Sequence, residues 1–260
     1  MFTEGQSGEE WEPGRALADF LFLRRLTQPP VVTYVLLAVN VLVWMTMTVA
    51  GGSTNVEVLV AFGAKVNSLI RAGEWWRLIM PLFLHIGVIH LLFNSYALYV
   101  LGSPLENLYG WRPYVLLYFV AGIGGSVGSL LGSENVSAGA SGAIFGLLGA
   151  GVVFGYRYRK RIPVPFRRYF GASLVPWVAF NLFYGLVNRH LDNYAHLGGL
   201  LTGMLLTLLL TPTVFARQPG RWQRVGLNGA VVAVGLLVLL AWGAAVQNIG
   251  RSWPHLQLPY

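Results

Sequence analysis

The sequence feature that most constrains this chain is a series of seven long windows without a single Asp, Glu, Lys or Arg. Each window holds at least 20 residues, and a helix rising about 1.5 Å per residue needs about 20 apolar residues to cross the ~30 Å bilayer core. Inside lipid the backbone must satisfy its own hydrogen bonds, so each crossing should be helical. We therefore predict an all-α, polytopic membrane bundle with transmembrane helices at 31–50, 87–104, 113–131, 140–156, 170–188, 194–211 and 226–247.

The composition excludes several other classes of protein. Hydrophobic residues make up 55% of the 260 residues and charged residues only 11%, against roughly 25% charged in soluble domains. This balance argues against a disordered chain and against an ordinary soluble domain. There is no cysteine, which excludes disulfides, thiolate chemistry and cysteine-ligated zinc.

The basic residues predict the orientation in the membrane. With a cytoplasmic N-terminus, thirteen Lys and Arg residues fall on the cytoplasmic side and five on the outer side, as the positive-inside rule requires. The strongest element is the loop 157–168. No aromatic platform or groove-reading motif accompanies this loop, so no nucleic-acid partner is expected. Sixteen Arg against two Lys suggest a GC-rich genome, and we expect a multi-pass protein of a bacterial plasma (inner) membrane.

Four polar side chains are expected at one depth, near the outer ends of three helices that enter from the outer side. His90 and Asn94 are four residues apart and therefore share a helix face. Ser141 begins the helix 140–156, and His196 lies near the start of the helix 194–211. Polar groups inside a membrane are costly, which makes each of them a functional candidate, although single ones often serve only packing.

Small residues predict that the last two of these helices pack closely together. They recur in the sequence at Gly139 and Gly142 in one segment, and at Ala195, Gly199 and Gly203 in the other. Close packing of this kind would bring the hydroxyl of Ser141 to the ring of His196, which is a nucleophile beside a base. Asn94, His90 and the backbone N–H of Ser141 would then supply donors to an oxyanion.

At this point the sequence resembles the rhomboid family of intramembrane serine proteases. The resemblance spans about residues 30 to 212 and is specific because four blocks occur in order. These blocks are Glu74-Trp75-Trp76-Arg77, the run from His85 to His90-Leu91-Leu92-Phe93-Asn94, Gly139-Ala140-Ser141-Gly142, and Asp192-Asn193-Tyr194-Ala195-His196-Leu197-Gly198-Gly199 with Gly203.

The resemblance implies roles for particular residues. Ser141 would be the nucleophile and His196 its general base, without a third acid, while His90 and Asn94 would stabilise the oxyanion. The family's Trp-Arg pair in the outer loop would be Trp76 and Arg77, with Glu74 as an ion partner, and would have a structural role. No cofactor or metal is implied.

The resemblance also implies a domain layout and an activity. A cytoplasmic tail at 1–28, with an amphipathic turn near Leu17–Leu26, would precede a six-helix protease core at 29–212. A linker, a seventh transmembrane helix and an outer tail would follow at 213–260. Such a protein would hydrolyse peptide bonds in or near transmembrane segments of protein substrates in the lipid bilayer, through a site open to the outer side and a lateral gate.

Two positions depart from the simplest family pattern. Phe145 stands where some bacterial members carry a Tyr that stacks on the base, and Phe keeps the ring. Asp192 invites a triad, but its place at a loop edge favours a solvated carboxylate.

Two other functions remain open. A catalytically silent relative would bind or dislocate membrane proteins, yet both Ser141 and His196 are present. A transporter is disfavoured, because no inverted repeat is apparent. The sequence does not indicate the oligomeric state or the substrate.

Overall fold

The computed structural model describes residues 13–188, 191–215 and 221–256 of the chain. Residues 1–12 of the expected tail, and Arg189 and Arg217 of the charge count, lie outside the described residues.

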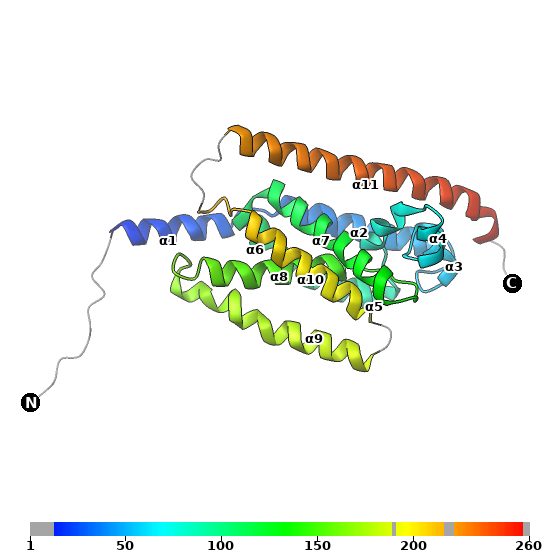
Figure 1. Ribbon diagram of the computed structural model, residues 1–260, viewed down its shortest axis with the longest axis horizontal. Helices are drawn as coiled ribbons and strands as arrows, with labels where there is room; N and C mark the ends of the chain where they lie inside the picture. Colours follow the sequence, from blue (N-terminus) through cyan, green and yellow to red (C-terminus); the bar gives the residue numbers. More distant parts are fainter. Residues whose placement is uncertain (1–12, 189–190, 216–220, 257–260) are drawn as a thin grey trace, which may run out of the picture.

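A helix occupies each of the seven expected positions, and the prediction of an all-α membrane bundle is confirmed. Five apolar segments are long enough to cross a membrane: Asp19–Val49, Gly87–Tyr109, Trp111–Gly132, Val164–Val187 and Gln223–Trp253. The other two, α8 (Ser141–Arg157) and α10 (Asn193–Leu209), have 17 residues each. Helix α8 is buried along most of its length, whereas α10 keeps one apolar face exposed, with Leu201, Leu205 and Leu209 at 50%, 65% and 82% exposed (Figure 1).

The remaining elements connect or flank this set. Helix α1 (Pro13–Leu26) precedes α2 (Val31–Val49), so the single amphipathic turn expected near Leu17–Leu26 is in fact a helix of 14 residues. Helix α9 (Val175–Val187) follows the short 3-10 helices η4 (Val164–Tyr169) and η5 (Gly171–Leu174). Helix α11 (Arg221–Leu256) ends the described chain and lies along the opposite edge of the bundle from α9 (Figure 1).

The second membrane helix is longer than the expected range 87–104. It begins as α5 (Gly87–Ala97), continues through the π-helical segment η3 (Leu98–Gly102), and ends with α6 (Ser103–Tyr109). The extension carries Glu106, which is only 5% exposed. A buried carboxylate is costly unless it is well hydrogen-bonded, and its partners lie on α2.

Glu106 caps the start of α2 from a neighbouring helix. Its two carboxylate oxygens accept from the backbone N–H groups of Val32 and Thr33, at 2.9 and 2.8 Å, and from the Thr33 hydroxyl at 2.8 Å. Pro30, at the N-cap position, supplies no side-chain cap. The first amides of a helix need acceptors, so this carboxylate fixes α2 to α6. The sequence analysis did not single out Glu106, although a lone acid between apolar windows was a usable signal.

The segment between α2 and α5 folds as a compact cap over one end of the bundle. It contains α3 (Val56–Phe62), α4 (Asn67–Arg71), η1 (Trp75–Leu78) and η2 (Met80–Phe83). We call this end of the molecule the loop end. An isolated antiparallel bridge pairs Lys65 of this segment with Ser137, which lies between α7 (Trp111–Gly132) and α8.

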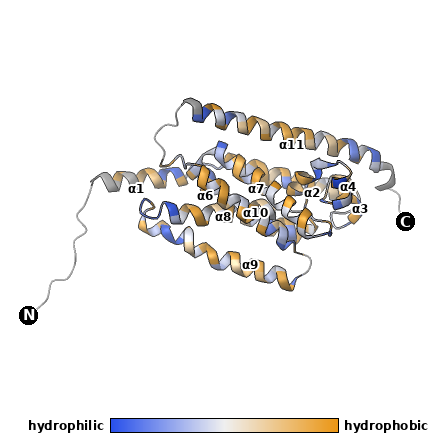
Figure 2. Cartoon of the chain, viewed as in Figure 1, coloured by the Kyte–Doolittle hydropathy of each residue, from blue (hydrophilic) through white to orange (hydrophobic). Residues whose placement is uncertain are grey.

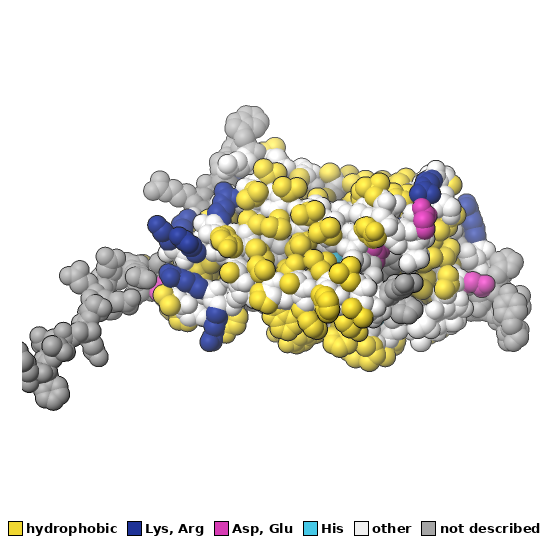
Figure 3. All heavy atoms as spheres, turned by 60° about the horizontal axis from the view of Figure 1, so that its bottom comes forward, with side chains coloured by type: hydrophobic (Ala, Val, Ile, Leu, Met, Phe, Trp, Pro, Cys, Tyr) yellow, Lys and Arg dark blue, Asp and Glu magenta, His cyan; other side chains and the backbone are white. Residues whose placement is uncertain are grey.

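The surface matches a protein that crosses a bilayer. Figure 2 shows hydrophilic residues gathered near the ends of α11 and hydrophobic ones along its middle. Figure 3 shows a broad hydrophobic band with Lys and Arg side chains clustered at one end. The loop after α8 carries much of this charge, through Arg159, Lys160, Arg161, Arg167 and Arg168. We call that end the basic end; it lies opposite the loop end.

Candidate active site

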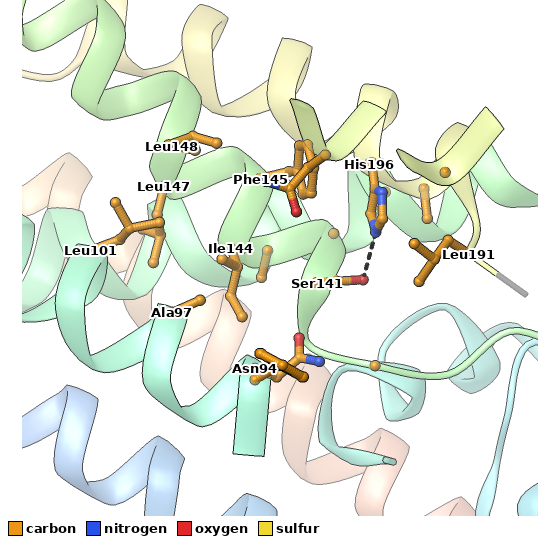
Figure 4. A pocket seen from close by; sticks show the side chains of 18 of the residues that line it. Asn94, Ala97, Leu101, Ser141, Ile144, Phe145, Leu147, Leu148, Leu191 and His196 are labelled. Carbon is orange, nitrogen blue, oxygen red and sulfur yellow. Dashed lines mark hydrogen bonds between the residues drawn. The ribbon is translucent and has the colours of Figure 1, made fainter. Parts of the chain in front are cut away.

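Ser141 and His196 meet in the interior of the bundle. The Oγ of Ser141 lies 3.1 Å from Nε2 of His196, and the two residues are 55 positions apart in the chain. His196 is only 5% exposed. Figure 4 shows the two side chains pointing toward one another from α8 and α10, with Asn94 of α5 across the cavity. A hydroxyl at hydrogen-bond distance from an imidazole is the arrangement that activates a serine for attack.

Ser141 owes its position to the chain that precedes it. Gly139 has φ +141°, and a Cβ there would lie 2.8 Å from Cε1 of His90. Only glycine combines this backbone angle with so close an approach. Ser141 is the first residue of α8, and Ala140 at the N-cap has no capping side chain. The first backbone N–H groups of α8 therefore have no side-chain cap from this position, and such groups at a helix start can bind an anion.

His196 is positioned by the capped start of α10. Asp192 is the N-cap, and its carboxylate accepts from the backbone N–H of Ala195 at 3.0 Å and from the hydroxyl of Ser129 on α7. The expectation of a solvated loop carboxylate is therefore wrong: Asp192 is half-buried and has two donors. Among the described residues, no partner is found for Nδ1 of His196, so Asp192 orders the helix and does not complete a triad.

Phe145 stacks on the imidazole ring of His196. Its ring centroid lies 4.1 Å from that of His196, with an angle of 6° between the planes. Phe145 and Ser141 lie one turn apart on α8. The aromatic face thus fixes the plane of the imidazole and covers one side of it.

The stacking of Phe145 on His196 should contribute measurably to the rate of the reaction that we propose below. We expect Phe145→Ala to lower the rate of cleavage of a membrane substrate about 3- to 10-fold, since an aromatic pair contributes about 0.5–1.5 kcal/mol beyond burial. Phe145→Tyr keeps the ring and should retain the rate. Rates measured with the protein reconstituted in liposomes compare the two variants. An unchanged rate in Phe145→Ala, or an equal loss in both variants, would contradict a role for stacking, since Tyr keeps the ring.

His90 and Asn94 lie on one face of α5 and line the same cavity as Ser141 and His196. The backbone N–H of Ile86 donates to Nδ1 of His90 at 3.2 Å, which leaves Nε2 of that ring next to Gly139. One N–H of the Asn94 amide donates to the carbonyl of His90 at 2.9 Å. The second N–H of the amide remains available to a ligand.

Glu74, Trp76 and Arg77 lie apart from this cavity, in the cap at the loop end. The Nε of Arg77 is 2.7 Å from a carboxylate oxygen of Glu74, and the guanidinium lies 4.4 Å from the centre of the Trp76 ring. Arg77 also donates to the carbonyls of Val60 and Ala64. Burial lowers the pKa of Arg77, and Glu74 opposes this effect. The three residues tie η1 to α3 and so hold the cap together.

The small residues form the contacts between α8, which carries Ser141, and α10, which carries His196. A Cβ on Gly199 would lie 1.9 Å from the carbonyl oxygen of Gly142, and one on Gly203 would lie 2.1 Å from that of Gly146. Helix α7 joins the same contact, because a Cβ on Gly125 would lie 2.9 Å from the carbonyl of Ala195. The part of α7 in this contact was not predicted from the sequence. The signal was its glycines, which recur at the spacing of a helix-packing face: Gly122, Gly124, Gly125, Gly128 and Gly132.

A cavity of about 2550 Å³ surrounds the serine and extends between α5 and α9. Its walls include exposed aromatic side chains, among them Phe93 on α5 and Trp177 on α9, which are 72% and 64% exposed. Gly185 is the only buried residue of α9. The cavity is therefore open on the side where lipid or another membrane helix would lie.

These features define a helical membrane protein in which a half-buried serine and a buried histidine lie beside a laterally open cavity. A family model for the rhomboid domain matches residues 72–213. This match covers more than half of the chain, and the chain belongs to the rhomboid family.

Named relatives carry the same family designation. The chain is 45% identical over 181 residues to Rhomboid protease GluP of Bacillus subtilis, covering 70% of this chain and 35% of that protein. It is 33% identical over 182 residues to Putative rhomboid protease YdcA of Bacillus subtilis, covering 69% of this chain and 88% of that protein. RHOMBOID-like protein 9, chloroplastic, of Arabidopsis thaliana is 30% identical over 170 residues, 64% of this chain and 38% of that protein. The chain thus spans about a third of the length of GluP.

Proposed function

We propose that this chain is an intramembrane serine endopeptidase that hydrolyses peptide bonds in or near transmembrane segments of other membrane proteins. The observation that carries the proposal is the 3.1 Å separation of the Ser141 hydroxyl and the His196 imidazole inside a membrane bundle. Residues 29–212 would form the protease core. Membership of the rhomboid family and the names of the two Bacillus relatives support the same activity.

The proposed chemistry is a two-step acyl transfer. The Oγ of Ser141 attacks the carbonyl carbon of the scissile bond, while Nε2 of His196 takes the hydroxyl proton. The tetrahedral intermediate collapses, His196 gives its proton to the leaving amine, and an ester to Ser141 remains. Water then attacks this ester while Nε2 of His196 takes one of its protons, which gives a second tetrahedral intermediate. As this intermediate collapses, His196 returns the proton to the Oγ of Ser141, and the product leaves as a carboxylic acid that ionises in water.

The negative charge of the tetrahedral intermediate needs donors that are already in place. We infer that these donors are the free N–H of the Asn94 amide, the His90 ring and the first amides of α8, because His90, Asn94 and Ser141 line one cavity and α8 begins at Ser141 without a side-chain cap. Each such donor contributes about 10²–10³-fold in turnover. The proposal needs no metal or cofactor, since these groups of the chain itself supply every proton and every donor.

The proposed topology has the basic end in the cytoplasm and the loop end outside. The basic residues between α8 and η4 support this orientation through the positive-inside rule, and they fit a bacterial plasma membrane. The substrate helix would enter between α5 and α9. A regular helix hides its peptide bonds in backbone hydrogen bonds, so the substrate must unwind locally to reach Ser141.

A serine-directed fluorophosphonate probe tests whether the chain is an enzyme or a silent binding protein. We expect the probe to label Ser141 in the reconstituted protein, because the neighbouring base makes the hydroxyl nucleophilic. Labelling should be lost in His196→Ala and be retained in a variant of a remote lipid-facing residue, Leu239→Ala. Peptide mass analysis locates the label. A folded wild-type protein that stays unlabelled would favour the binding function.

A further inference from the structure

Lys65 is a buried cation beside the active site that the proposed chemistry does not use. It lies between α3 and α4 in the cap, lines the large cavity, and is only 1% exposed. A buried ammonium group is costly unless it is fully hydrogen-bonded. Its hydrogen bonds therefore indicate what the protein gains from keeping a charge there.

All of the acceptors of Lys65 belong to one segment, residues 133–140, which leads from α7 to the serine. Its Nζ donates to the carbonyl of Ser133 and, at 3.1 Å, to that of Asn135. Its backbone N–H donates to the carbonyl of Ser137 at 2.9 Å, and its own carbonyl accepts from the N–H of Ser137 at 3.1 Å. Lys65 thus donates to the carbonyls of every second residue from Ser133 to Ser137.

The next anchor of this segment lies at the catalytic serine itself. The N–H of Gly139 donates to the carbonyl of Pro81 at 2.9 Å, and Ser141 follows two residues later. Between these anchors Glu134, Asn135 and Val136 are exposed. At the start of this stretch Asn67 of α4, which is 3% exposed, also donates to the carbonyl of Ser133 at 3.0 Å. The carbonyls of Asn135 and Ser137 further along are held by Lys65.

We propose that Lys65 is a positioning residue, which fixes the segment 133–140 and thereby sets the place of Ser141 and the first amides of α8 relative to His196. This inference rests on the proposed protease function for its catalytic consequence. Its structural consequence, an ordered segment 133–140, does not depend on catalysis.

The pH dependence of activity distinguishes a role for the charge of Lys65 from a purely structural role. Burial lowers the pKa of Lys65, while Asp192 at the start of α10 and Glu134 in the segment oppose this shift and Arg71 of α4 adds to it. The amine should therefore lose its proton at a lower pH than an exposed lysine. Activity should decline on the alkaline side as the cation disappears, and Lys65→Arg should move that decline to higher pH.

The main test compares Lys65→Met, which keeps the length of the side chain and removes the charge, with the wild type in liposomes. We expect kcat to fall about 10- to 100-fold with KM nearly unchanged, because a displacement of about 1 Å at a reacting group can cost 10²-fold. Since the chain has no cysteine, a single cysteine at Val136 carries a spin label in both proteins. Its mobility should rise in Lys65→Met.

A matched control uses the exposed ion pair that joins the same two segments. Arg71 and Glu134 lie 2.9 Å apart, with side chains 63% and 73% exposed. Exposed pairs contribute about 0–1 kcal/mol, so Arg71→Gln should leave kcat and label mobility unchanged.

Two results would overturn the inference. One is a Lys65→Met protein with unchanged label mobility; the other is a loss of activity that only follows the loss of folded protein in thermal unfolding. If the wild type neither cleaves a substrate nor reacts with the fluorophosphonate probe, the protease proposal fails, and the label mobility still decides the role of Lys65.

Discussion

Ser141→Ala is expected to abolish cleavage of a membrane substrate in proteoliposomes while the protein stays folded. Among the described residues, the Ser141 hydroxyl is the nucleophile that lies within hydrogen-bond distance of Nε2 of His196, at 3.1 Å. Loss of a serine nucleophile typically removes about 10⁴-fold or more of the rate. His196→Ala should have an effect of similar size, because the serine then has no group to take its proton. Substrate fragments separated on gels give the rate.

The two variants together test more than either one alone. A nucleophile and its base act as a unit, so the double variant should be no worse than each single one. Thermal unfolding should show that each variant remains folded. Cleavage by folded Ser141→Ala at the wild-type rate would contradict the proposed mechanism.

Gly199→Ala is expected to damage both the fold and the site. The new Cβ would lie 1.9 Å from the carbonyl oxygen of Gly142, where nonbonded carbon contacts are normally about 3.5 Å or longer. Helices α8 and α10 must then separate, which moves His196 away from Ser141. We expect about 1–3 kcal/mol lower stability, as for other overpacked contacts, and about a 10²-fold loss of activity from misplacement. Thermal unfolding and the cleavage assay measure the two effects.

Gly243→Ala on α11 is the matched control, because a Cβ there would meet nothing within 4 Å. The same substitution in an open helix position should keep activity and slightly favour the helix, by about 0.5–1 kcal/mol. If Gly199→Ala behaves like Gly243→Ala, the close contact of α8 and α10 is not needed for the site.

Much of the architecture was predictable because membrane insertion depends on local properties. A charge-free window of 20 or more residues leaves a chain in lipid few alternatives to a helix. The depth of the four polar residues follows from counting along such helices. The spacing of Gly199 and Gly203 likewise predicts a close contact with the helix of Ser141.

Other features required the tertiary structure, since they depend on which helices become neighbours. In the sequence Glu106 only marks the end of a charge-free window. In the structure it belongs to α6, and its carboxylate caps the start of α2. In the sequence Asp192 looked like a solvated loop carboxylate, but its hydrogen bond with Ser129 of α7 makes it a half-buried cap of α10. In the sequence Lys65 is only one of the five basic residues expected on the outer side. Nothing local in the sequence indicates that it binds the segment 133–140.

The sequence by itself determined that the chain crosses a membrane as helices and which polar side chains share a depth, because hydropathy and helix periodicity act over a few turns. Only the tertiary structure decided the partners of those side chains. Residues 55 positions apart meet because glycine contacts among α7, α8 and α10 bring backbones together, and no local pattern specifies the rotation of one helix against another. The polar groups that order the site, from Asp192 to Lys65, therefore became identifiable only once the helices were packed.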